Sequence, residues 1–199
     1  MSNHRMNLLV PEHTIRWYGV GETCTDPVNG DIMLVKHKTL MGDAIAEAQK
    51  VLVITEPELK GYTWNNHSAF IRWQDSRPFV SEMGPKGYER RPLLGYEHEL
   101  YCIINLQCAP AQRNQSLLSD QACEGLDYGW LEYLPFVLDG LTWAKFSASW
   151  GDAIICSTYV TLLAMAMGLF PDREPNGVAP CHLSLWFDAK PPDTLLVAA

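Results

Sequence analysis

Cys156 has the residue type and the sequence position of a nucleophile. Apolar residues follow it at four, seven, eight and eleven positions, a spacing that predicts a helix with Cys156 on its apolar face. Cys156 would lie in the first turn of that helix, where unpaired backbone N–H groups and the positive end of the helix dipole favour a thiolate. The alternative is a buried cysteine that only packs as a small apolar residue.

His67 is the one of the six histidines that falls inside a strand-like pattern. A hairpin centred between Gln74 and Asp75 would place Glu82 directly opposite His67. Such a carboxylate would fix the tautomer of the imidazole and orient the ring toward a nucleophile. A half-buried polar pair that only fixes the strand register is the alternative.

The elements that would position these side chains can be predicted from apolar periodicity and from turn residues. Asn66–Ile71 and Phe79–Met83 are expected to be neighbouring antiparallel strands. The other predicted elements are a strand over 32–35, a helix over 39–52, a strand over 99–107, a loop over 109–125, a helix interrupted or started at Pro135, the Cys156 helix and a strand over 182–188.

Composition points to one compact domain. Hydrophobic residues make up 47% of the 199 residues and charged residues 19%, which is enough apolar surface for a sizeable core. We expect an N-terminal extension over 1–28, a domain over 29–188 and a C-terminal tail over 189–199. Leu195 and Leu196 in that tail are expected to be buried by the body or by another chain, so the chain is expected to act with protein partners in an assembly.

Charge and hydropathy argue against nucleic-acid binding and against a membrane-spanning helix. A formal net charge of −8 would repel phosphate backbones, which argues against nucleic acid. The uncharged run 153–170 has the minimum length of a membrane span, but Asp152 and Asp172 flank it and polar residues crowd its first half, so a buried core helix is predicted. Met6–Val10 is too short for a secretory signal, which predicts synthesis in the cytoplasm.

The remaining cysteines form no CxxC pair and fit no zinc-finger spacing, so neither a metal nor another cofactor is predicted. A structural metal site built from some of them stays open as an alternative; these are Cys24, Cys102, Cys108, Cys123 and Cys181. His37 reads as a solvated surface residue. Glu97, His98 and Glu99 could bind a metal but are predicted to form a solvated loop.

The order of short motifs resembles one protein family. The stretches GDIMLV, NHSAFI, FVSEMGPKGY, DYGWLEYL, AIICSTYVTLLAMAMGLF and VAPCHL, which run from Gly30 to Leu183, resemble the circularly permuted NlpC-type branch of papain-like cysteine hydrolases. That branch includes YiiX-like and lecithin:retinol-acyltransferase-like proteins. Thr158 stands where many relatives have glutamate, and NNHSAFI stands where Ser-His-Val is more usual.

The resemblance implies an α+β papain-like fold in which an antiparallel sheet packs against the cysteine-bearing helix. It implies Cys156 as nucleophile, His67 as general base and Glu82 as the orienting residue of a thiol hydrolase. The implied substrates are peptides, peptidoglycan or other amides, and lipid esters. An acidic chain without a signal would suit a phage tail component. The rival hypothesis is a non-catalytic structural or adaptor module whose cysteines are buried or hold a metal.

Overall fold

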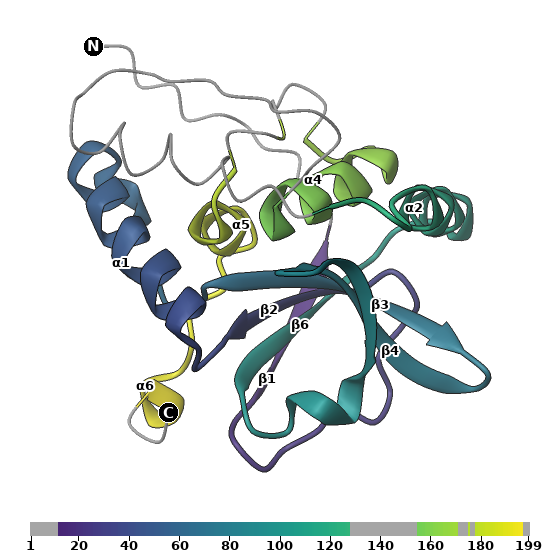
Figure 1. Ribbon diagram of the computed structural model, residues 1–199, viewed down its shortest axis with the longest axis horizontal. Coiled ribbons are helices and arrows are strands. Elements are labelled where there is room, and N and C mark those ends of the chain that lie inside the picture. Colours follow the sequence, from purple (N-terminus) through teal and green to yellow (C-terminus); the bar gives the residue numbers. More distant parts are fainter. Residues whose placement is uncertain (1–11, 128–154, 171–174, 176–177, 197–199) are drawn as a thin grey trace.

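The computed structural model describes residues 12–127, 155–170, 175 and 178–196 and shows an α+β protein (Figure 1). Its six-stranded sheet has the order β1-β6-β2-β3-β4-β5, and all neighbours are antiparallel. The strands are β1 (His13–Tyr18), β2 (Ile32–Lys36), β3 (His67–Gln74), β4 (Arg77–Gly84), β5 (Gly87–Pro92) and β6 (Leu100–Leu106). The helices are α1 (Leu40–Thr55), α2 (Pro110–Ala122), α4 (Cys156–Ala166), α5 (Pro180–Trp186) and α6 (Asp193–Leu196), with short 3-10 helices η1 (Pro57–Leu59) and η2 (Leu93–Tyr96).

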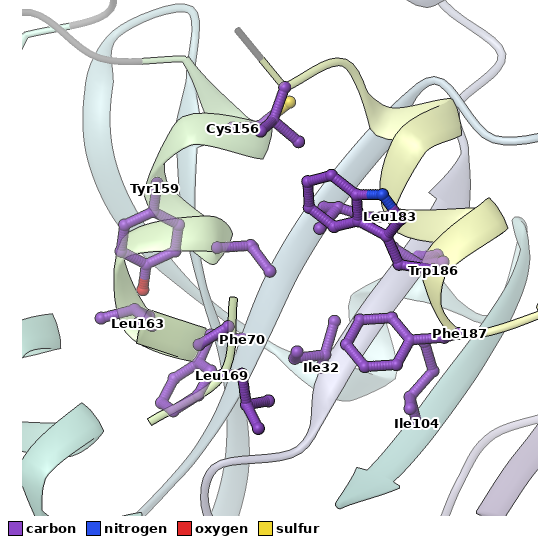
Figure 2. Packing of buried hydrophobic residues seen from close by; sticks show 14 of the residues in the cluster. Ile32, Phe70, Ile104, Cys156, Tyr159, Leu163, Leu169, Leu183, Trp186 and Phe187 are labelled. Carbon is purple, nitrogen blue, oxygen red and sulfur yellow. The ribbon is translucent and has the colours of Figure 1, made fainter. Parts of the chain in front are cut away.

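Both faces of the central strands are buried. On one face, Ile32, Phe70 and Ile104 pack against α4 and α5 (Figure 2). On the other face, Val35, Ile71 and their neighbours pack beneath η2. This explains why the sequences of β2 and β3 are nearly continuous apolar runs and do not alternate between apolar and polar residues.

The predicted hairpin is present, but its register differs from the expected one. Phe70 pairs with Ser81 and Gln74 pairs with Arg77, so the turn is centred between Asp75 and Ser76, one residue later than predicted. Asp75 and Ser76 both have positive φ, as in the primed turns that match the twist of a hairpin. Glu82 is therefore not directly opposite His67.

Two other sequence expectations were wrong. Residues 109–125 contain helix α2 rather than a loop, and residues 182–188 contain most of α5 rather than a strand. Sequence reasoning also missed β1 and β5, although it correctly predicted the strands now labelled β2 and β6 and the helices α1 and α4. The helix expected near Pro135 lies outside the described residues.

The C-terminal tail is less buried than expected. Leu195 is half-buried near Gly19, whereas Leu196 is 42% exposed. β1 lies within residues 1–28 and is an edge strand of the sheet. None of the described helices is long and apolar enough to cross a membrane.

We expect Ser76→Gly to raise the free energy of unfolding by about 0.5 to 1 kcal/mol, because glycine adopts positive φ without the steric cost that serine incurs. Ser119→Gly, at an exposed position within α2, is the control and should lower that free energy by about 0.5 kcal/mol. Urea unfolding followed by circular dichroism measures both. A destabilised Ser76→Gly variant would contradict the turn geometry.

Candidate functional site

The structure brings Cys156, His67 and Glu82 together from three elements. His67 is the first residue of β3, Cys156 is the first residue of α4, and Glu82 lies near the end of β4. Extending the observed register puts Glu82 opposite Ala69, so it is a diagonal neighbour of His67 on the same face of the sheet. The predicted contact thus forms although the predicted register was wrong.

His67 interacts with both of the other side chains. Its Nε2 lies 2.6 Å from Oε2 of Glu82, and its ring also shares a hydrogen bond with the Cys156 side chain. Burial lowers the pKa of His67, but the charges of Cys156 and Glu82 and the hydrogen bonds with both outweigh burial and raise that pKa above its usual value. The imidazolium form is therefore favoured beside the sulfur.

Glu82 is a fully buried carboxylate with several donors. Its Oε2 accepts from the Tyr96 hydroxyl at 2.6 Å as well as from His67, and its Oε1 accepts from Nε of Arg91 at 2.6 Å. Burial raises the pKa of Glu82, but His67, followed by Tyr96 and Arg91, holds it well below its usual range. The group therefore remains an anion and can orient the ring of His67.

Polar contacts fix helix α4, which carries Cys156. The Tyr159 hydroxyl donates to Oδ1 of buried Asp120 at 2.5 Å, and Arg72 donates to the other oxygen of Asp120 at 2.6 Å. Thr158, at the position where relatives have glutamate, donates to the carbonyl of Pro175 at 3.3 Å. These bonds set the position of the first turn of α4, and thereby that of the thiol.

His37 belongs to the site, although its sequence position suggested a solvated residue. Its ring centroid lies 4.8 Å from that of His67, and its Nδ1 lies 3.1 Å from Oε1 of Glu99. Burial lowers the pKa of His37, and the neighbouring His67 lowers it further against the opposing effect of Glu99. The contact between His37 and Glu99 follows from strand pairing. Lys36 pairs with Leu100 between β2 and β6, so His37 and Glu99 form the next pair in that register.

Two asparagines hold the end of β2 beside β3. The Asn66 side chain accepts from the backbone N–H of His37 at 2.7 Å and donates to the His37 carbonyl at 2.9 Å. Asn65 donates to the carbonyl of Pro180 and accepts from Ser184, both in α5. The amide pair thus joins the strand that carries His67 to a second helix.

A cleft of about 300 Å³ opens at His67. Its lining is mixed in character and consists of His37, Thr39, Met41, Gly42, Ile45, Asn66, His67, Met83, Gly84, Pro85, Glu89, Arg91, Gly95, Tyr96 and Glu99. Cys156 is absent from this lining and is fully buried. The cleft therefore reaches the imidazole of His67 but not the sulfur of Cys156.

Cys102, Cys123 and Cys181 have the environment of packing residues. Burial raises the pKa of Cys102, raises that of Cys123 to about 11 and raises that of Cys181 to about 12. None of these thiols belongs to a group of three metal-binding side chains in the described part of the chain. The group that does meet that criterion is His37, His67 and Glu82, whose ligand atoms lie within 4.8 Å of one another.

The wall of the cleft depends on a glycine. A Cβ atom at residue 42 would lie 2.6 Å from Nδ2 of Asn66 and 2.6 Å from the carbonyl oxygen of His37. Gly42→Ala should therefore lower the free energy of unfolding by about 1 to 3 kcal/mol, although alanine normally stabilises a helix relative to glycine.

Gly95→Ala is the matched control, because nothing lies within 4 Å of the added methyl group, and it should change stability by less than about 0.5 kcal/mol. Chemical denaturation of both variants measures the difference. Equal stabilities would show that α1 does not pack against Asn66 as described.

Comparison with known proteins identifies a fold. No family model matches the chain, and no curated protein matches it. Among solved structures, the metalloprotein YiiX from Escherichia coli O157:H7 matches with a TM-score of 0.50 and 17% sequence identity, over 72% of this chain and 68% of that one. The chain therefore has a YiiX-like α+β fold.

Proposed function

We propose that the protein is a cysteine hydrolase with the permuted papain-like arrangement, which cleaves an amide or ester bond with Cys156, His67 and Glu82. The observation that carries the proposal is the position of His67, whose Nε2 contacts Glu82 and whose ring also interacts with the Cys156 side chain. A nucleophile, a base and a group that orients the base are the parts that acyl transfer requires.

In the proposed reaction, His67 holds the thiol proton and the sulfur of Cys156 attacks the carbonyl carbon. The bond to the leaving group then breaks, and His67 gives its proton to the departing nitrogen or oxygen. Water next attacks the thioester while His67 accepts a proton from it, which releases the acid and restores the thiol. Glu82 stays ionised throughout and stabilises the imidazolium.

The start of α4 provides a donor for the oxyanion. Residue 155, the N-cap, is an isoleucine and offers no side-chain hydrogen bond to the first turn. We assign the backbone N–H of Cys156, at the first position of α4, to the developing oxyanion. The cleft at His67 is the route proposed for the substrate, whose class is peptide, peptidoglycan or lipid ester. A role in a phage tail stays a prediction from the sequence, and the proposed chemistry does not depend on it.

YiiX, the protein that shares this fold, is described as a metalloprotein, so the fit of a metal to the present site matters. Two imidazoles and a carboxylate from His37, His67 and Glu82 are suitable donors for a borderline divalent ion. A bound ion would supply a Lewis acid that polarises a carbonyl. No step of the thiol mechanism requires it.

One observation favours a second candidate function, a structural or adaptor module. Cys156 is fully buried and does not line the cleft. In this case Cys156 would pack as a small apolar side chain of the core (Figure 2), where it lies at the start of α4 close to other apolar residues. The reactivity of Cys156 in the native protein distinguishes the two functions.

We expect iodoacetamide to label Cys156 at least about tenfold faster at pH 7 than Cys102, Cys123 or Cys181, whose thiols are held protonated by burial. The part of the raised His67 pKa that is due to Cys156 also favours the thiolate, because the attraction within an ion pair stabilises both members. His67→Ala should therefore slow labelling of Cys156 about tenfold and shift its pH profile to higher pH. Peptide mass spectrometry after short exposures between pH 5 and 9 gives the rates.

The matched control is His98→Ala, which removes an exposed histidine that does not line the cleft and should leave the rate unchanged. Glu82→Gln should slow labelling less than His67→Ala, because it loosens the ring without removing the base. The structural module would be the correct function if Cys156 is labelled only after unfolding, or if its labelling rate does not depend on His67.

A further inference from the structure

Three metal-binding side chains meet at the cleft, and two of them, His67 and Glu82, also serve the thiol mechanism. The ligand atoms of His37, His67 and Glu82 lie within 4.8 Å of one another, and His37 and His67 both line the cleft. A tetrahedral zinc ion at about 2.1 Å from its ligands needs them about 3.4 Å apart. His67 and Glu82, now 2.6 Å apart, would separate slightly to admit the ion between them, and the ring of His37 would turn toward it. Water would fill the remaining coordination position from the cleft.

A second layer of contacts supports these three donors. Nδ1 of His37 faces Glu99, which leaves Nε2 as the nitrogen available to a metal. Glu82 is held by Arg91 and Tyr96, so its carboxylate is already oriented. A histidine anchored by a carboxylate and a ligand carboxylate anchored by donors are the usual supports of a protein metal site.

The charges around the cleft favour a cation. Three carboxylates, Glu82, Glu89 and Glu99, lie in or beside the cleft, against two cationic groups, Arg91 and the imidazolium of His67, so the negative charge is in excess. One oxygen of Glu99, Oε2, is buried without a hydrogen-bond partner among the described residues. A divalent ion on Nε2 of His37 would polarise the ring and strengthen its Nδ1–H bond to the other oxygen of Glu99.

We propose that the cleft binds Zn²⁺ through His37, His67 and Glu82, and that the bound ion reversibly inhibits the hydrolase. The inhibition rests on the proposed function, whereas the metal site does not. An imidazole that ligates a metal has used its one lone pair and cannot accept a proton. His67 therefore serves either the metal or Cys156, and zinc and catalysis exclude each other.

Isothermal titration of the reduced, metal-free full chain with ZnCl₂ tests the site. We expect one strong site in the wild type and at least about tenfold weaker binding in His37→Phe, which keeps a ring between His67 and Tyr96 but removes both nitrogens. His98→Phe, the same change at a histidine whose side chain is 81% exposed, should bind as the wild type does. Cys156→Ser should also retain the site, which excludes binding driven by the thiolate.

His37→Gln, which can keep a hydrogen bond to Glu99, is the second variant if His37→Phe fails to fold. Equal zinc affinities in the wild type and in a folded His37 variant would overturn the site. MgCl₂ should give no comparable heat, because Mg²⁺ prefers oxygen ligands. A magnesium affinity equal to that for zinc would also overturn the assignment.

Turnover of p-nitrophenyl acetate tests the inhibition. Saturating zinc should abolish wild-type turnover and a chelator should restore it. The rate of His37→Phe, measured relative to the rate of the same variant without zinc, should not fall at that zinc concentration. Zinc binding that leaves wild-type turnover intact would overturn the inhibition. A metal-free wild type without turnover and without rapid Cys156 labelling would contradict the hydrolase itself, and the titration would still decide the metal site.

Discussion

A carboxylate that leaves water completely costs several kcal/mol unless opposite charge and hydrogen bonds replace its hydration. Glu82 meets this condition with three donors from three elements, His67 of β3, Arg91 of β5 and Tyr96 of η2. The guanidinium of Arg91 also lies over the ring of Tyr96, with 5.3 Å between its Cζ and the ring centroid. The need to compensate one buried anion therefore determines how β4 and its neighbours surround the imidazole.

The sequence allowed the key contact to be predicted because strand geometry tolerates a particular error. Moving the centre of a hairpin by one whole residue shifts each cross-strand partner by two residues, which keeps every side chain on its original face. Glu82 thus moved from the position opposite His67 to a diagonal one and stayed within reach. The apolar spacing after Cys156 was sufficient to predict a helix with that residue in its first turn, and α4 begins there.

The elements that could not be predicted depend on tertiary contacts. Helix α2 has a polar sequence and is held by Arg113, which binds Asp31, and by buried Asp120 rather than by an apolar stripe. α5 has the composition of a strand, yet it starts at a proline and packs against α4 and α1. His37 could be assigned to the site only from the pairing of β2 with β3, which brings it beside His67, and with β6, which brings it to Glu99.

The amide of Asn66 has a consequence for the chemical lifetime of the protein. Its NH₂ group donates to the carbonyl of His37, so hydrolysis of this amide to an acid would place one oxygen against another. The resulting repulsion would act on the end of β2, next to both histidines of the cleft. Ageing by deamidation at this single residue would therefore disturb the candidate site without changing any residue that is assigned to its chemistry.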